Sequence, residues 1–161
     1  MAYADNINHC ENIDDIIDLC HESLPIDYQA RPWLHLNHGV ELLKSEDELN
    51  CYMSAYGDMH VGKCRAAMMN FPFDKLNGSI EIVDWGCGQG IGSATIIDVL
   101  KQHDLLQWLR KITLIEPSTH ALNRAVCNVT KLTHNSVEIE ARNKQYEHYR
   151  DKLLSFKEKE N

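Results

Sequence analysis

The sequence is short of prolines, of basic residues and of long apolar runs. It holds four prolines in 161 residues, and the last of them is Pro117. No apolar stretch approaches the roughly 20 residues that a membrane-spanning helix needs, so no membrane partner is expected. The polar, acidic start MAYADNINHCEN lacks the basic and apolar regions of a secretory signal. These absences predict a cytoplasmic protein.

Basic residues are outnumbered, with 16 Lys and Arg against 24 Asp and Glu and a net charge of −8. Nucleic-acid binding needs clustered Lys and Arg, so direct binding of nucleic acid by this chain is not expected. The six cysteines include no pair with the CxxC spacing. Scattered cysteines in a cytoplasmic protein are usually reduced thiols, and structural zinc sites usually show tighter pairing, so no metal is expected.

The first half of the chain carries helix signals. Asn12 is a candidate N-cap, and Ser45 with Glu48 matches a capping box. Gly57 and its neighbour Asp58 are expected to end the helix that begins after Ser45. The predicted helices span residues 13–23, 46 to about 56, and 59–70. Residues 1–44 are interpreted as a helical extension and residues 45–161 as the main domain.

The second half alternates short apolar runs with amphipathic segments. The run 80–85 (IEIVDW) is nearly all apolar, as expected of a strand covered on both faces. Alternation of strands and helices predicts a parallel sheet with right-handed crossovers. Residues from 142 onward are highly charged, which predicts a solvated helix. The predicted strands are 80–85, 112–115 and 137–141, the predicted helices are 93–102 and 119–132, and Leu105, Leu106, Trp108 and Leu109 are expected to extend the packing of the first of these helices.

Three alternating glycines follow the first strand, in the stretch Asp84-Trp-Gly86-Cys87-Gly88-Gln-Gly90. Gly86 permits a turn that a Cβ would obstruct, and the next two glycines allow close approach of ligand and helix. The helix N-terminus after the turn favours an anion. This stretch resembles motif I of the class I, Rossmann-like methyltransferases that use S-adenosylmethionine.

The resemblance implies a cofactor site for S-adenosylmethionine, with roles for residues that match the family pattern. Asp84 would lie near the ammonium group, and Glu116 would accept hydrogen bonds from the ribose hydroxyls. Glu116 lies 26 residues after Gly90, longer than the usual gap of about 20, so residues 104–111 are interpreted as an insertion. The remaining candidates are Cys87 and Pro117, beside these residues, and Tyr56 and His60, on a segment that would cover the cofactor.

The resemblance also implies a fold: a partial Rossmann-like, three-layer αβα domain holding the first three strands, preceded by helices. In the family, catalytic and substrate-side residues usually follow the fourth strand, so no catalytic residue is assigned and the methyl acceptor stays unidentified. The chain is therefore interpreted as an N-terminal part or a natural truncation. Its first strand would pair with a second copy, giving a homo-oligomer, or with the missing C-terminal half.

Two other functions stay open. One is a non-catalytic module that binds the cofactor or a protein partner. The other is an NAD-linked oxidoreductase, which is disfavoured because the G-x-G-x-x-G pattern meets Ile91 or Ser93 where its last glycine belongs. The P-loop pattern fails as well, since no Gly-Lys-Ser/Thr follows.

Overall fold

The computed structural model describes residues 3–36 and 41–145. Its sheet has three parallel strands in the order β1-β2-β3, and helices alternate with them along the chain. The elements are α1 (Tyr3–Asn6), α2 (Ile13–Glu22), α3 (Ile26–Gln29), α4 (Glu46–Met68), β1 (Ile80–Trp85), α5 (Ile91–Gln102), β2 (Leu109–Ile115), α6 (Thr119–Leu132) and β3 (Glu138–Arg142), with 3₁₀ turns at Ile7–His9, Pro32–His35, Phe73–Lys75 and Leu106–Trp108.

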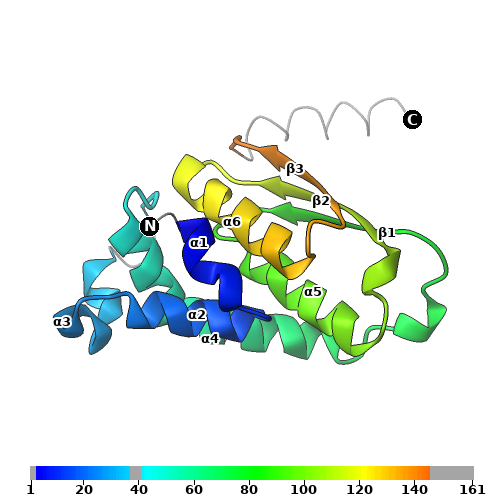
Figure 1. The fold of residues 1–161 in the computed structure, drawn as a ribbon, viewed down its shortest axis with the longest axis horizontal. Helices are drawn as coiled ribbons and strands as arrows, with labels where there is room; N and C mark the ends of the chain where they lie inside the picture. The colour runs from blue at the N-terminus through cyan, green and yellow to red at the C-terminus, as the bar shows by residue number, and fades with distance from the viewer. Residues whose placement is uncertain (1–2, 37–40, 146–161) are drawn as a thin grey trace, which may run out of the picture.

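The layers differ from the prediction. Both crossovers run in the same direction across the sheet, so right-handed connections place α5 and α6 on the same face. Figure 1 shows these two helices beneath the sheet, with α2 and α4 beneath them in turn. Within residues 3–36 and 41–145, no helix covers the opposite face of the sheet, so the described layers are sheet, helix and helix.

Strand β1 has the predicted bounds but not the predicted environment. Val83 is 54% exposed and Trp85 is 44% exposed, so the expectation that both faces of this strand are covered is wrong for the described part of the chain. Ile82, which points to the helical face, is buried. The apolar run therefore buries one side of the strand and leaves the other accessible.

Strand β2 begins three residues earlier than predicted, at Leu109. Arg110 and Lys111 hid this start because charged residues are unusual in a central strand. Lys111 lies on the uncovered face, where its ammonium group contacts Glu138 at 2.9 Å and Glu140 at 2.8 Å. The expected insertion therefore ends before β2. Part of the long spacing between Gly90 and Glu116 arises because β2 is longer than predicted.

The helix caps follow the sequence. The Asn12 side chain accepts a hydrogen bond from the Asp15 amide at 2.9 Å and starts α2. Ser45 and Glu48 form the predicted capping box at the start of α4. Capped ends of this kind satisfy backbone donors that have no partner within the helix.

Gly57 does not end α4, and the prediction of two helices between residues 46 and 70 is wrong. A Cβ at this position would lie 2.9 Å from two side-chain carbons of Ile17. Glycine is present because α2 packs closely against α4 at this point, and the packing offsets the helix propensity that glycine lacks.

One continuous core joins the N-terminal segment to the sheet. Ile7, Ile13 and Ile16 are almost fully buried, together with Ile97 and Ile112. The boundary expected at residues 44 and 45 coincides with the start of α4, but the helices before it share the core of the domain. No helix in the described ranges has the length and apolar character needed to span a membrane.

Candidate functional site

The glycine turn leaves β1 through three residues with left-handed backbone angles. Gly86, Gly88 and Gly90 have φ values of 67°, 54° and 78°. Only glycine adopts such angles readily, which accounts for the alternation. The amides of Gly86 and Cys87 donate to the Ile115 carbonyl at 2.8 and 3.1 Å. The turn is therefore anchored to the end of β2.

The three glycines have different surroundings. A Cβ on Gly86 or Gly88 would meet nothing within 4 Å. A Cβ on Gly90 would lie 3.1 Å from the Cβ and 3.2 Å from the Cα of Ala125 in α6. The first two glycines border open space, so the expected obstruction of a Cβ at Gly86 is wrong and its left-handed φ alone favours glycine. The third glycine allows α6 to approach the turn.

Glu116 reaches from the end of β2 back to the turn. Its Oε2 accepts a hydrogen bond from the Gly88 amide at 3.0 Å, and its Oε1 accepts one from the Ser118 amide at 2.9 Å. Glu116 is buried, with 8% of its surface exposed. Each carboxylate oxygen has a further lone pair, so Glu116 retains capacity to accept hydrogen bonds from a ligand.

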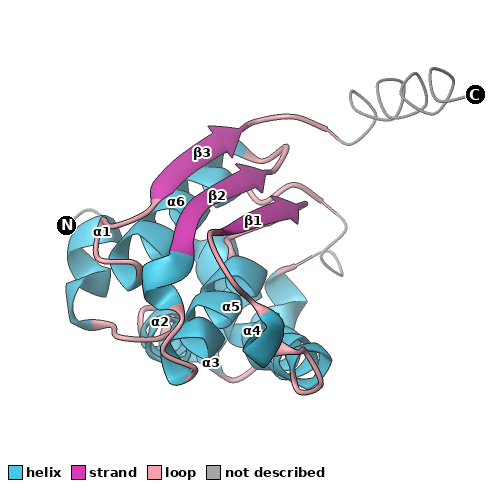
Figure 2. Ribbon diagram, turned by 90° about the vertical axis from the view of Figure 1, so that its right-hand side faces the viewer, coloured by secondary structure: helices cyan, strands magenta, loops and turns pink. Residues whose placement is uncertain are grey.

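Asp84 lies near the end of the neighbouring strand, and its side chain contacts α5. Its Oδ2 accepts hydrogen bonds from the Ser93 hydroxyl at 2.7 Å and the Ser93 amide at 3.2 Å. This contact places a carboxylate at the positive end of the helix, which is electrostatically favourable. Asp84 lies in β1 and Glu116 directly follows the adjacent parallel strand β2, so both lie toward the same edge of the sheet, visible as the row of arrowheads in Figure 2.

Two hollows flank the turn at this edge. The larger has a volume of about 590 Å³ and the smaller about 220 Å³. The larger falls within the range of small-molecule sites, roughly 300–1,000 Å³. Both hollows are lined by Gly86 and Glu116; the larger adds Trp85, Ile115, Pro117, Lys144 and Gln145, and the smaller adds Glu41, Leu42, Leu43, Tyr52, Gly88, Gln89, Ser118 and Ala121.

Some of the predicted site residues line these hollows and others do not. Gly86, Gly88, Glu116 and Pro117 line the hollows. The lining does not include Asp84, Cys87 or Gly90, nor Tyr56 or His60.

Cys87 is a buried thiol. Burial, and then the nearby carboxylates of Asp84 and Glu116, together raise the pKa of Cys87 to about 12. A thiol with such a pKa stays protonated at neutral pH and is a poor nucleophile. Cys87 is therefore a small residue of the turn.

Tyr52, one turn before Tyr56, lines the smaller hollow. Its hydroxyl lies 3.2 Å from His60 Nε2, and its ring is stacked near the His60 ring and edge-on to the Tyr56 ring. Burial, and then the charge of Lys63, lower the pKa of His60. Tyr56 and His60 thus contact the tyrosine that reaches the hollow.

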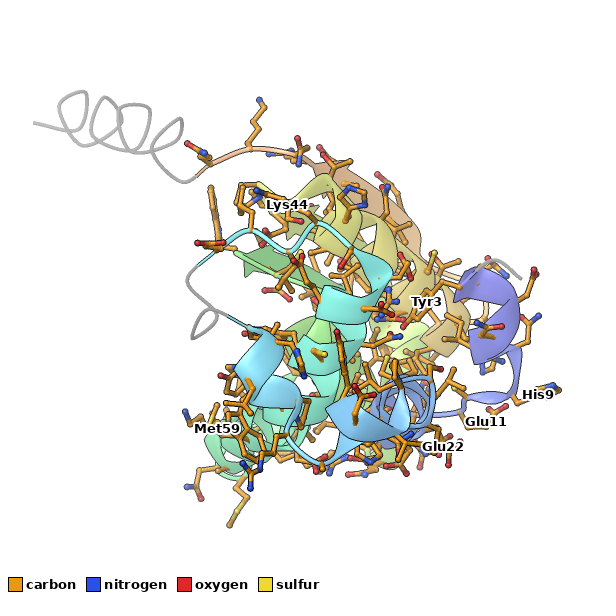
Figure 3. The ribbon with its side chains drawn as sticks, turned by 90° about the vertical axis from the view of Figure 1, so that its left-hand side faces the viewer. Tyr3, His9, Glu11, Glu22, Lys44 and Met59 are labelled. Carbon is orange, nitrogen blue, oxygen red and sulfur yellow. The ribbon has the colours of Figure 1, made fainter. Side chains whose placement is uncertain are left out.

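Sequence reasoning missed the segment that covers the smaller hollow. The Ser118 hydroxyl donates to the Leu43 carbonyl at 2.9 Å and accepts a hydrogen bond from the Ala121 amide at 3.2 Å. Figure 3 shows the segment carrying Lys44 as it passes over the start of α6. Serine before a helix is a recognisable N-cap signal, but the contact with Leu43 leaves no trace in the sequence.

Comparisons with known proteins found no matching family model, no matching curated protein and no matching solved structure. In the described part of the chain, no group of three or more His, Cys, Asp or Glu side chains is placed to hold a metal ion.

Proposed function

We propose that this chain binds S-adenosylmethionine at the turn formed by residues 86–90, as the cofactor-binding part of a class I methyltransferase. The observation that carries the proposal is the position of Glu116. Its carboxylate joins the end of β2 to the Gly88 amide, beside two hollows and two glycines that leave open space. Ligands of open parallel sheets bind at this edge, outside the carboxyl ends of the strands.

The residues present fit the cofactor. Glu116 has lone pairs left for the ribose hydroxyls. The hydrogen bonds between Asp84 and Ser93 use only Oδ2 of the carboxylate, so its other oxygen would serve the ammonium group, directly or through water. Gly90 is the N-cap residue of α5 and provides no side-chain cap, so the N-terminus of this helix would favour the carboxylate.

When bound, the cofactor supplies an electrophilic methyl group on a sulfonium ion. The chain's own residues bind and orient the nucleoside, and this alignment of donor and acceptor is the main contribution of the protein to direct displacement. The methyl acceptor is unidentified, and no residue here is assigned as a general base.

Titration calorimetry of the whole chain with S-adenosylmethionine, S-adenosylhomocysteine and NAD tests the proposal. We expect heat of binding with the first two ligands and none with NAD. Binding of NAD alone would support the oxidoreductase alternative and overturn the proposal.

A second candidate function is a module that assembles through β1 without catalysing a reaction. It is favoured because β1 pairs only with β2 among the described strands, while Val83 and Trp85 are partly exposed. The backbone N–H and C=O groups on the edge of a sheet can pair with a strand of another chain, here the β1 strand of a second copy. We expect wild type to sediment as a dimer, and we expect Val83→Lys to sediment as a monomer because lysine on an edge strand opposes pairing. A monomeric wild type at high concentration would eliminate this candidate.

A further inference from the structure

A buried polar network lies behind the glycine turn and holds it to two helices. Gln89, in the middle of the turn, is 1% exposed. Its Nε2 donates to the Leu49 carbonyl of α4 at 2.9 Å, and its backbone carbonyl accepts a hydrogen bond from Asn128 of α6 at 3.0 Å. Its Oε1 accepts a hydrogen bond from Arg124 Nη1 at 3.3 Å. The position of the turn therefore depends on Asn128 and Arg124.

Arg124 is the charged centre of this network and is 3% exposed. Its Nη1 also donates to Asn50 Oδ1 at 2.7 Å, and its Nη2 forms an ion pair with Glu46 at the start of α4. Its Nε is buried and has no hydrogen-bond partner among the described residues. A buried charge is costly unless it is paired, so the guanidinium holds its place only while its partners and its cover are present.

Tyr3, from the first helix of the chain, provides that cover. The Arg124 Cζ lies 4.0 Å from the centroid of the Tyr3 ring, a cation–π contact. The Tyr3 hydroxyl donates to Asn128 Oδ1 at 2.8 Å. Burial strongly raises the pKa of Tyr3, so the hydroxyl remains a neutral donor. Figure 3 shows Tyr3 between α1 and α6. Tyr3 thus contacts two of the three residues that hold Gln89.

Removal of the Tyr3 ring would open the network to water. A hollow of about 200 Å³ already lies beside Tyr3, Asn50 and Arg124. Water entering an enlarged hollow would compete for the guanidinium and weaken its hydrogen bond to Gln89, because hydrogen bonds with charged groups are stronger in a dry environment.

We propose that Tyr3 is a positioning residue of the glycine turn. Through Arg124 and Asn128 it keeps Gln89 in place, and it thereby keeps the Gly88 amide and Glu116 in their observed arrangement. The consequence for cofactor affinity rests on the proposed function, whereas the consequence for the order of the turn does not.

Amide hydrogen exchange of Tyr3→Ala and Tyr3→Phe, without ligand, tests the order of the turn. The amides of Gly88 and Gly90 are hydrogen-bonded and serve as reporters, with Ile112 and Leu114 in β2 as references. For Tyr3→Ala we expect exchange at the reporter amides to accelerate about tenfold relative to wild type, beyond any acceleration at the reference amides. This factor corresponds to a loss of about 1.4 kcal/mol. Tyr3→Phe keeps the ring over Arg124, so we expect a smaller acceleration that follows loss of the hydroxyl alone.

Leu132→Ala is the matched control, because Leu132 is 1% exposed at the C-terminal end of α6 and takes no part in the hydrogen bonds described for the network. It should destabilise the core without selective exchange at the turn. Equal exchange in Tyr3→Ala and wild type, or equal selective acceleration in Leu132→Ala, would overturn the inference.

Calorimetry with S-adenosylhomocysteine gives the second readout, with about tenfold weaker binding expected for Tyr3→Ala than for wild type. If the wild type binds neither this ligand nor S-adenosylmethionine, the proposed function fails while the exchange result still decides the role of Tyr3.

Discussion

Replacing Glu116 with alanine is expected to weaken the binding of S-adenosylhomocysteine by about 10- to 100-fold. The substitution removes the carboxylate proposed to accept the ribose hydroxyls, and a hydrogen bond to a charged group contributes about 1.5–3 kcal/mol. It also removes the acceptor of the Gly88 and Ser118 amides, so the turn itself loses support. Titration calorimetry measures the change in dissociation constant.

Two further variants complete this test: one separates the charge of Glu116 from its shape, and the other is a control. Glu116→Gln keeps the size of the side chain but offers an NH₂ group to amides that need acceptors, so it should lose most of the same affinity. Glu138→Ala removes an exposed carboxylate at the start of β3, away from the turn, and should bind like wild type. Affinity within twofold of wild type in both Glu116 variants would remove Glu116 from the site.

Replacing Gly90 with alanine is expected to lower the free energy of unfolding by about 2–5 kcal/mol. A left-handed backbone costs a residue with a Cβ about 1–2 kcal/mol, and overpacking adds about 1–3 kcal/mol. The added Cβ would lie 3.2 Å from the Cα of Ala125, so α6 itself must move. Urea unfolding measures the change.

Gly62→Ala is the control for this prediction. Gly62 lies within α4, and a Cβ there would meet nothing within 4 Å. Alanine should therefore stabilise the protein by about 0.5–1 kcal/mol, the ordinary gain over glycine inside a helix. Two substitutions of glycine by alanine are thus expected to have opposite signs, and a Gly90→Ala variant as stable as wild type would contradict the packing explanation.

Local patterns predicted most of the elements. The bounds of β1 and of α6 are those expected, and α2 and β3 differ from the prediction by one residue at each shifted end. These segments carry signals that act over a few residues, such as caps, apolar periodicity and glycine turns.

Errors arose where a distant contact changed the meaning of a residue. Gly57 is a helix-breaking signal within its own segment, yet α4 continues because Ile17 of α2 packs against it. Lys111 is a poor residue for a covered strand, yet β2 includes it because Glu138 and Glu140 lie beside it on the uncovered face. In both cases the contacting residues lie in a different segment of the chain, so the local sequence pattern does not include them.

The site shows the same division. The glycine spacing of the motif predicts the turn, and the position of Glu116 at the end of the next strand predicts its role despite the longer gap. The structure places Gly86, Gly88 and Glu116 around one edge of the sheet. Tyr56 is predicted at the site, whereas Tyr52, one turn earlier on the same helix, lines the smaller hollow, because only the direction of that helix relative to the turn selects between them.

The sequence by itself determined the alternation of strands and helices, the turn at residues 86–90 and the carboxylate that follows β2, since these depend on backbone preferences and short spacings. The tertiary structure decided which face of the sheet is covered, which side chains reach the hollows, and that Tyr3 lies over Arg124, 121 residues later in the chain. Contacts between distant segments depend on how the elements pack together, and packing is a property of the folded chain that no single segment encodes.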